Sequence, residues 1–294
     1  MYPSRRRAIV TVLAALAPAR PLSAAPPSVL EVQGGQYASF DGAQLFYRRM
    51  GKGPPVILLH GFLSDGPRSW FSTGVAQSLA QAGFSVVAPD ARAHGLSAAP
   101  PGPYPKDVLA MDVEALIHAL NLRSYRLFGN AMGSRTAIRL MARGARPERC
   151  VLGGTGIRGA VGVEGLANAN AETILTGRSS RDPRLGVLVK AAIRLQKLSP
   201  AALISVLRSQ VSTPAAVLAK IKTPILVLNG ETDQVEGDPG PLAALFPAAR
   251  LERAPGDHIT ALREPRFASI AAAFLKSRDA PSDFVPPPVV ESPK

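Results

Sequence analysis

The 294-residue chain contains a single cysteine, Cys150, and a single tryptophan, and aromatic residues make up only 5% of it. One cysteine excludes an intramolecular disulfide. Cys150 opens a short apolar segment, so we expect a buried, small hydrophobic residue and not a nucleophile. Hydrophobic residues still reach 46%. The chain can therefore bury a large core, and its aliphatic side chains suit helices packed on a parallel sheet.

Acidic residues are also scarce, since 21 Asp and Glu stand against 34 Lys and Arg, for a formal net charge of +13. Ten of the basic residues lie between Arg158 and Lys222, among only three acidic ones. This excess is compatible with contact to an anionic membrane surface or an acidic substrate, and equally with solvated, arginine-rich helix faces. No interleaved aromatic and basic pattern accompanies it, so the charge does not indicate a nucleic-acid partner.

The first segment has the order of an export signal. Three arginines, residues 5–7, precede an apolar run over residues 8–19 and a small-residue site at 22–25. We predict a signal peptide over residues 1–24 and a periplasmic or secreted protein, with twin-arginine and general secretory export both open. Cleavage would remove four arginines and no acid, which lowers the formal charge from +13 to +9. The run is shorter than the roughly 20 apolar residues that span a membrane, which argues against an uncleaved anchor. No later segment is long and apolar enough either, so no transmembrane span is expected in the mature chain.

Apolar segments alternate with helical periodicity along most of the remaining chain. Strands are predicted at 55–59, 84–88, 125–128, around 151, 223–228 and 250–253, and helices at 70–82, 106–120, 132–143, 241–246 and 264–276. Segments 36–40 and 43–49 predict a β-hairpin around Asp41-Gly42. Apolar strands separated by amphipathic helices predict a mostly parallel sheet with helices on both faces.

Between residues 158 and 213 only helical periodicity remains. We interpret this stretch as a small helical cap inserted into a core of residues 35–157 and 214–279. The proline-rich tail, 280–294, cannot sustain a helix and is predicted to be disordered.

Short motifs follow several of the predicted strands. They are Leu59-His60-Gly61-Phe62, Asp90-Ala91-Arg92-Ala93-His94-Gly95-Leu96-Ser97, Gly129-Asn130-Ala131-Met132-Gly133, Gly230-Glu231-Thr232-Asp233 and Gly256-Asp257-His258. Their residues and their order resemble the α/β-hydrolase fold superfamily over about residues 35–276, most of all its small bacterial esterases and lipase-like hydrolases. The resemblance implies the eight-stranded type of sheet that is characteristic of this fold.

The strand-to-helix elbow is where the sequence departs from that family. Gly129 and Gly133 are in register with the family's Gly-x-Ser-x-Gly, and they allow a sharp, strained turn. Ala131 takes the nucleophile position, and a methyl group cannot attack a carbonyl, so the acyl-enzyme route is closed. Ser134 is the nearest hydroxyl, but it is expected to point away from the apex of the turn.

The resemblance implies that Asp233 is the acid of a hydrolase triad, with Glu231 and Asp238 as alternatives, and that His258 is its base. The chain order of elbow, acid and histidine is the one that this fold uses. His94 is expected to have a structural role.

Three functions follow from these assignments. The first is a hydrolase-derived pseudoenzyme that binds an acyl or carboxylic-ester-like small molecule. The second is an active hydrolase or proton-abstracting enzyme, in which His258 and Asp233 activate water directly and the Phe62 and Met132 N–H groups form an oxyanion hole. The third is an exported protein that contacts surfaces through its basic cap. No metal or other cofactor is predicted, because the four histidines are scattered and no phosphate-binding glycine loop is present.

Overall fold

The computed structural model describes residues 31–162, 175 and 183–277, and a single eight-stranded sheet organises them. The strand order is β1-β2-β4-β3-β5-β6-β7-β8. The strands are β1 Val32–Ala38, β2 Gln44–Met50, β3 Pro55–Leu59, β4 Ser85–Pro89, β5 Arg126–Asn130, β6 Cys150–Gly153, β7 Ile225–Gly230 and β8 Ala249–Ala254. β2 pairs antiparallel with β1 and β4, and every other pairing is parallel. The predicted mostly parallel sheet is confirmed.

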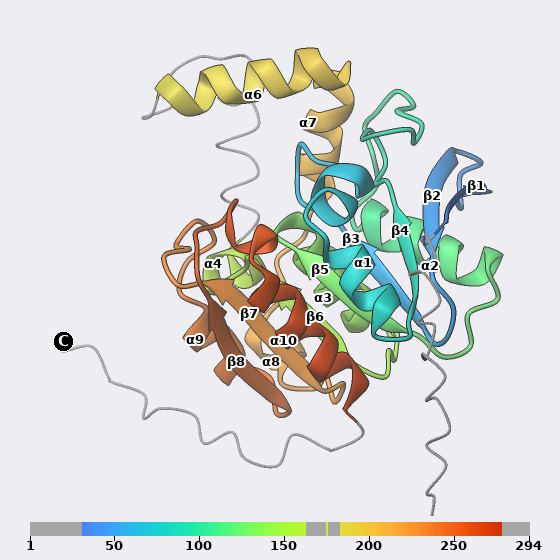
Figure 1. The fold of residues 1–294 in the computed structure, drawn as a ribbon. Helices are drawn as coiled ribbons and strands as arrows, with labels where there is room; N and C mark the ends of the chain where they lie inside the picture. Colours follow the sequence, from blue (N-terminus) through green and yellow to red (C-terminus); the bar gives the residue numbers. More distant parts are fainter. Residues whose placement is uncertain (1–30, 163–174, 176–182, 278–294) are drawn as a thin grey trace, which may run out of the picture.

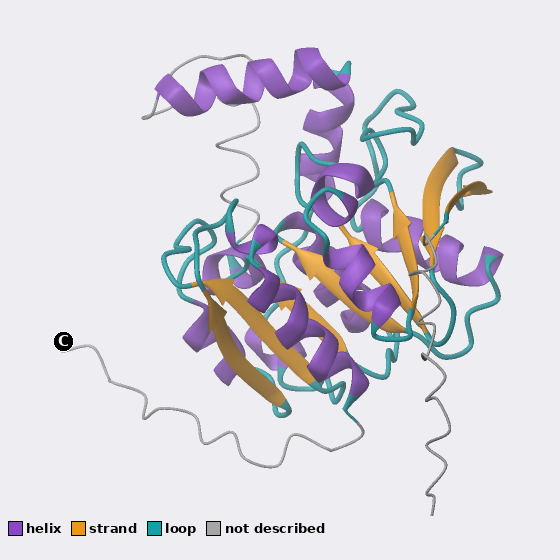
Figure 2. Ribbon diagram, viewed as in Figure 1, coloured by secondary structure: helices purple, strands orange, loops and turns teal. Residues whose placement is uncertain are grey.

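Helices cover both faces of this sheet (Figures 1 and 2). They are α1 Val75–Gln81, α2 Val108–Ala119, α3 Met132–Ala142, α4 Ile157–Val161, α6 Pro183–Gln196, α7 Pro200–Ser209, α8 Ala215–Leu218, α9 Pro239–Ala244 and α10 Pro265–Lys276. In Figure 1, α1 and α10 lie in front of the sheet, whereas α2, α3 and α8 lie behind it.

Alternating residues of the central strands explain the two cores. Val56 and Leu58 of β3 point to the cluster that α1 and α10 cover, and Ile57 and Leu59 point to the cluster that α2 and α3 cover. Successive side chains of a strand point to opposite faces, so a strand covered on both sides must be apolar at every position. This explains why the sequence of β3 is a continuous apolar run.

The structure corrects one predicted helix. The helix expected over 70–82 is divided into a short π-helical segment, Pro67–Phe71, and α1. Gly74 separates them with φ of 83°, a left-handed conformation that a continuous helix cannot include. The first strand of the predicted hairpin also begins earlier than expected, at Val32 instead of residue 36.

Two helices of the predicted cap, α6 and α7, lie over the edge of the sheet where β3 and β5 end (Figure 1). Leu203 and Val206 of α7 pack with Met132 and Phe62, so this part of the cap rests on the loops that follow β3 and β5. α4, which begins the sequence assigned to the cap, packs instead against α3 and α9 of the core.

The predicted export signal and proline-rich tail lie outside the described residues, as do residues 163–174 and 176–182 of the predicted cap. Within the described ranges, no helix combines the length and the apolar character that crossing a bilayer demands. Contact of the cap with an anionic surface stays a prediction.

Candidate active site

The elbow between β5 and α3 holds Ala131 in a strained conformation. Its φ of 49° and ψ of −112° lie outside the regions that residues with a side chain normally adopt. Gly129 and Gly133 make this turn possible. A Cβ at Gly129 would lie 2.4 Å from the Gly133 carbonyl oxygen, and a Cβ at Gly133 would lie 1.8 Å from that of Leu59. The elbow therefore has the geometry that presents a side chain at its apex, and the side chain presented is a methyl group.

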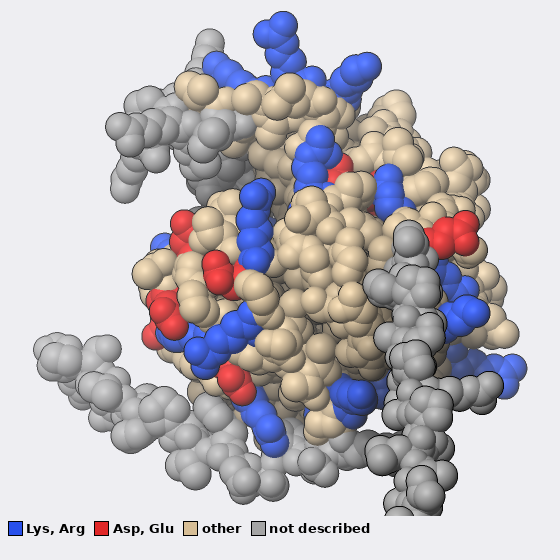
Figure 3. Space-filling view, viewed as in Figure 1, with Lys and Arg blue, Asp and Glu red and all other residues tan. Residues whose placement is uncertain are grey.

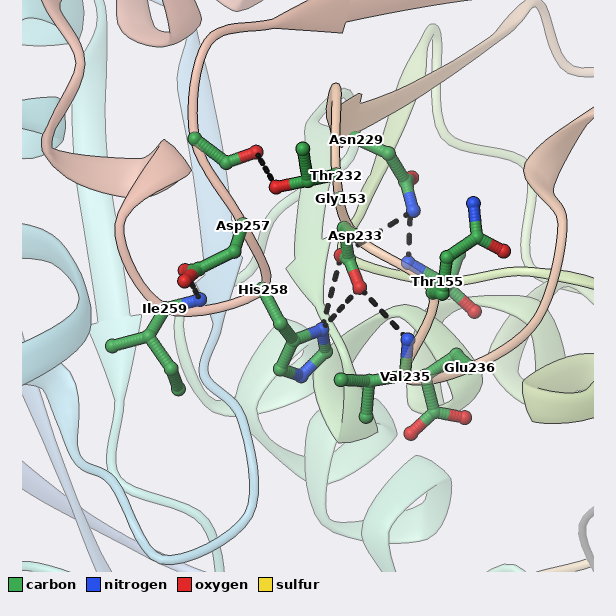
Figure 4. Close-up of polar contacts among 12 residues, drawn as sticks. Gly153, Thr155, Asn229, Thr232, Asp233, Val235, Glu236, Asp257, His258 and Ile259 are labelled. Carbon is green, nitrogen blue, oxygen red and sulfur yellow. Dashed lines mark hydrogen bonds and ion pairs between the residues drawn. The ribbon is translucent and has the colours of Figure 1, made fainter.

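The histidine and the acid lie together after β7 and β8 (Figure 4). His258 Nδ1 lies 3.0 and 3.1 Å from the two carboxylate oxygens of Asp233. The Asp233 side chain is buried, and it also accepts hydrogen bonds from the Val235 backbone N–H at 3.1 Å and the Asn229 amide at 3.5 Å. Because the carboxylate accepts the Nδ1 proton, a neutral His258 keeps its lone pair on Nε2.

The alternative acids identified in the sequence do not pair with His258. Glu231 is exposed, and Asp238 is the N-cap residue of α9, where its Oδ1 accepts the Gly240 N–H at 2.9 Å. Asp257, beside His258, has its pKa lowered by hydrogen bonds from the backbone N–H groups of Thr260 and Ile259. Of the carboxylates considered, Asp233 alone is in position to orient the imidazole.

Two buried histidines hold the loop after β3. His60 donates from Nδ1 to the Gly61 carbonyl at 2.8 Å and accepts the Ala91 N–H on Nε2 at 2.8 Å. His94 accepts the Leu63 N–H at 3.3 Å and lies 2.9 Å from the Arg92 carbonyl. Burial lowers the pKa of both rings, that of His94 to about 3, so both are neutral. They fix the turn that carries Phe62, and the structural role expected of His94 agrees with these contacts.

The two backbone donors of the predicted oxyanion hole border the elbow. Met132 is the first residue of α3, so its N–H has no acceptor within the helix. Phe62 follows Gly61, where an added Cβ would lie 3.6 Å from the Ala131 methyl group. Neither N–H forms a hydrogen bond to another described residue. The loop after β3 thus lies against the apex of the elbow.

These elements enclose a cleft of about 290 Å³, close to the lower size of small-molecule sites. Its lining includes Phe62, Ala131, Met132 and His258. Ser134 is absent from that lining, because its buried hydroxyl donates to the Gly153 carbonyl at 2.7 Å. Cys150 is also buried, and burial raises the pKa of its thiol, as suits the inert hydrophobic residue expected from the sequence.

Charged side chains of the cleft were not among the site residues predicted from the sequence. Arg68, Arg135, Glu236 and Arg263 all line it. Arg135 and Glu236 form an ion pair at 2.8 Å across 101 positions of the chain. One signal was available, because residues four apart share a face of a helix and Arg135 follows Ala131 at that spacing. Within the described ranges, no cluster of three or more His, Cys, Asp or Glu side chains is arranged to hold a metal ion.

Comparison with known sequences connects this geometry to a family. A family model for the alpha/beta hydrolase fold matches residues 54–152. The chain is 38% identical over 119 residues to bifunctional epoxide hydrolase 2 of Sus scrofa, which is 40% of this chain and 20% of that protein. It is 38% identical over 115 residues to N-formylmaleamate deformylase of Pseudomonas putida, 39% of this chain and 41% of the relative. The similarity thus spans at most about two fifths of these relatives.

Solved structures extend the similarity over most of the chain. A hydrolase from Pseudomonas aeruginosa superimposes with a TM-score of 0.68 and 27% identity, over 83% of this chain and 98% of that one. The enol-lactonase from Burkholderia xenovorans does so with a TM-score of 0.66 and 27% identity, over 82% and 100% of the two chains. On the sheet, the elbow and these matches, the chain belongs to the α/β-hydrolase fold superfamily.

Proposed function

We propose that this protein is a hydrolase-derived pseudoenzyme that binds an acyl or carboxylic-ester-like small molecule in the cleft beside Ala131. The observation that carries the proposal is the strained conformation of Ala131, φ 49° and ψ −112°, in a turn built to present a nucleophile. Hydroxyl, thiol and amine groups attack a carbonyl, but a methyl group has no lone pair. The neighbouring Ser134 hydroxyl is committed to the Gly153 carbonyl and offers no replacement.

The rest of the cleft supports a carbonyl ligand. The N–H groups of Phe62 and Met132 are donors of the kind that bind a carbonyl oxygen. Phe62 and Met132 also form an apolar cluster with the cap residues Leu203 and Val206. Apolar walls with a few convergent donors are typical of sites for small ligands. A bound ester would therefore find hydrogen-bond donors for its carbonyl oxygen and apolar side chains for the rest of the molecule.

Restoring the missing hydroxyl tests the proposal. We would measure hydrolysis of short p-nitrophenyl esters by the parent, by Ala131→Ser and by Ala131→Ser/His258→Ala. A burst of p-nitrophenol from Ala131→Ser alone is expected, since losing the nucleophile removes most of the roughly 10⁶-fold gain that a triad provides. No turnover by any of the three proteins would overturn the idea that only the nucleophile was lost.

Direct activation of water is the second candidate, and the Asp233–His258 pair favours it. With Nδ1 held by the carboxylate at 3.0 Å, His258 would take a proton from water or from a ligand on Nε2. This enzyme would hydrolyse esters without Ala131→Ser, would lose that activity with His258→Ala and would gain little from Ala131→Ser. The same three-protein experiment, extended by the single His258→Ala variant, separates the two candidates.

We also propose that the protein is exported, on the order of arginines, apolar run and small residues in positions 5–25. The intact mass of the protein recovered from cell fractions tests this. Export predicts a mature chain that starts near residue 25 outside the cytoplasm, and a full-length chain confined to the cytoplasm would contradict it.

A further inference from the structure

The charges of the cleft are unbalanced. Arg68, Arg135 and Arg263 line it, and among the described residues of its lining Glu236 is the only acidic side chain. Arg68 pairs with Asp65 outside the lining, and Arg263 is exposed and forms no ion pair with a described residue. Figure 3 shows basic side chains spread over the visible face of the molecule. The three arginines named above differ from a general surface charge because they line the same cleft.

Arg135 is the arginine closest to the elbow in the chain. It lies one turn into α3, where its backbone N–H donates to the Ala131 carbonyl at 3.2 Å. Its side chain is only 14% exposed, and both of its hydrogen bonds to Glu236, at 2.8 Å, leave from Nη1. The buried Nε has no hydrogen-bond partner. Glu236 therefore forms no hydrogen bond with the edge of the guanidinium that Nε and Nη2 make up.

The next two arginines on the same side of this helix show how that edge is used elsewhere in the protein. Arg139 donates from Nε and Nη2 to Asp107 at 2.8 and 2.7 Å, and Arg143 donates from the same two atoms to Glu114 at 2.7 and 2.9 Å. Two parallel N–H groups matched to two carboxylate oxygens form the strong, bidentate pairing that guanidinium favours. Arg135 has the same edge, but none of the residues that the structure describes supplies a carboxylate for it.

We propose that the ligand carries a carboxylate in addition to its acyl or ester group, and that the guanidinium of Arg135, which lines the cleft, binds this carboxylate. The inference rests on the proposed function, because it assigns a second recognition element to the same cleft. Arg135 is then the specificity-determining residue, and Arg68 and Arg263 attract the anion toward the cleft.

A single water molecule is the competing acceptor for Nε. Arg135 also borders a second cavity of about 20 Å³, lined in part by Arg139 and by Gln210, whose amide is buried without a partner. That volume is enough for one water. If water alone serves Nε, removing Arg135 leaves ligand preference unchanged, so ligand preference separates the two explanations.

Calorimetric titration of the parent protein with monomethyl glutarate and dimethyl glutarate tests the proposal. The two esters differ by one carboxylate. The half-ester should bind at least about tenfold more tightly, as a hydrogen-bonded ion pair is expected to contribute. Added salt should reduce the difference.

Variants assign the preference to Arg135. Arg135→Gln should bind both esters equally, and Arg135→Gln/Glu236→Gln should do the same without leaving the Glu236 carboxylate unpaired. Arg266→Gln removes an exposed arginine of α10 that does not line the cleft, and it should keep the parent's preference.

Three results would overturn the proposal. Equal binding of the two esters to the parent would reject carboxylate recognition while leaving an ester-binding cleft. If both Arg135 variants still bind the half-ester more tightly than the diester, residues other than Arg135 recognise the carboxylate. Binding of neither ester would reject the proposal, and turnover of p-nitrophenyl esters by Ala131→Ser would then show whether the proposed function itself survives.

Discussion

The two sides of the cleft differ in the reactive side chains that they present. On the side of β7 and β8, Asp233 is buried and binds His258 through both oxygens at 3.0 and 3.1 Å, with further donors from Val235 and Asn229. On the side of β5, the elbow keeps its glycines and its strained backbone, but Ala131 supplies no reactive atom.

The elbow shows that the backbone conformation of the turn does not depend on a reactive side chain at its apex. Residues held at a positive φ without being glycine cost about 1–3 kcal/mol, and they persist only where the surrounding structure imposes them. At the elbow, close packing of Gly133 against the Leu59 carbonyl imposes the turn, whichever side chain stands at the apex. The turn therefore forms with alanine at its apex, and it does not by itself supply a reactive atom.

Asp233 should have the largest effect on ester hydrolysis when Ala131→Ser supplies a nucleophile. In the Ala131→Ser background, Asp233→Asn should lower kcat for p-nitrophenyl ester hydrolysis by about 10³–10⁴-fold, because His258 loses the carboxylate that holds its proton on Nδ1. Glu231→Gln changes an exposed carboxylate on the same loop and should leave kcat unchanged. Equal kcat values for these two variants would refute the role of Asp233.

The packing that imposes the elbow predicts a large loss of stability. Gly133→Ala would place a Cβ 1.8 Å from the Leu59 carbonyl oxygen, a collision between backbone segments that no side-chain movement relieves. The unfolding free energy should fall by about 3 kcal/mol or more. Gly240→Ala, whose nearest described neighbour would lie at 3.4 Å, should change it little in the same denaturant titration. A stable Gly133→Ala protein would show that the turn is not imposed in this way.

Because Ala131 is strained, replacing alanine by glycine should affect the unfolding free energy differently at positions 131 and 137. Ala137→Gly, in the interior of α3, should cost about 1 kcal/mol or more through helix propensity. Ala131→Gly relieves an unfavourable φ, so its unfolding free energy should exceed that of Ala137→Gly by about 2 kcal/mol. Both values come from denaturant titrations of the two proteins side by side, and equal losses would mean that Ala131 carries no strain.

The loop after β3 predicts a smaller effect that depends on pH. Burial lowers the pKa of His60 and His94 in the folded protein, the latter to about 3. The unfolded chain therefore takes up protons first as the pH falls below about 6.5, and stability is lost from that pH downward. We expect His94 to contribute a loss of about 2 kcal/mol between pH 7 and pH 5, with His60 acting in the same direction, measured by denaturant titration. An unfolding free energy that stays constant over this range would contradict the buried, neutral state of both rings.

Most of the fold could be predicted because the strands are short apolar runs with clear helical periodicity between them. Buried strands such as β3 and β6 leave this signature in the sequence itself. The break between the π-helical segment and α1 was missed, since the apolar spacing runs through it and a single glycine at position 74 causes it.

Some residues of the candidate site could be predicted from the sequence, and others could not. Asp233 and His258 were predicted from their resemblance to the family's motifs and from their order along the chain, and their roles stay predictions. Arg135 and Glu236 were not identified, because their pairing joins α3 to a loop 101 residues later and neither residue belongs to a motif. Pairings of this kind depend on tertiary structure, so local patterns cannot predict them.

Labelling with a fluorophosphonate probe shows directly whether the cleft contains an activated serine, the group with which this reagent reacts. The parent protein and Ala131→Ser would be treated in parallel, and their intact masses measured. We expect an unmodified parent and one probe per chain of Ala131→Ser, with labelling lost in Ala131→Ser/His258→Ala. Stoichiometric labelling of the parent, for example at Ser134, would show that the protein has an active nucleophile and is not a pseudoenzyme.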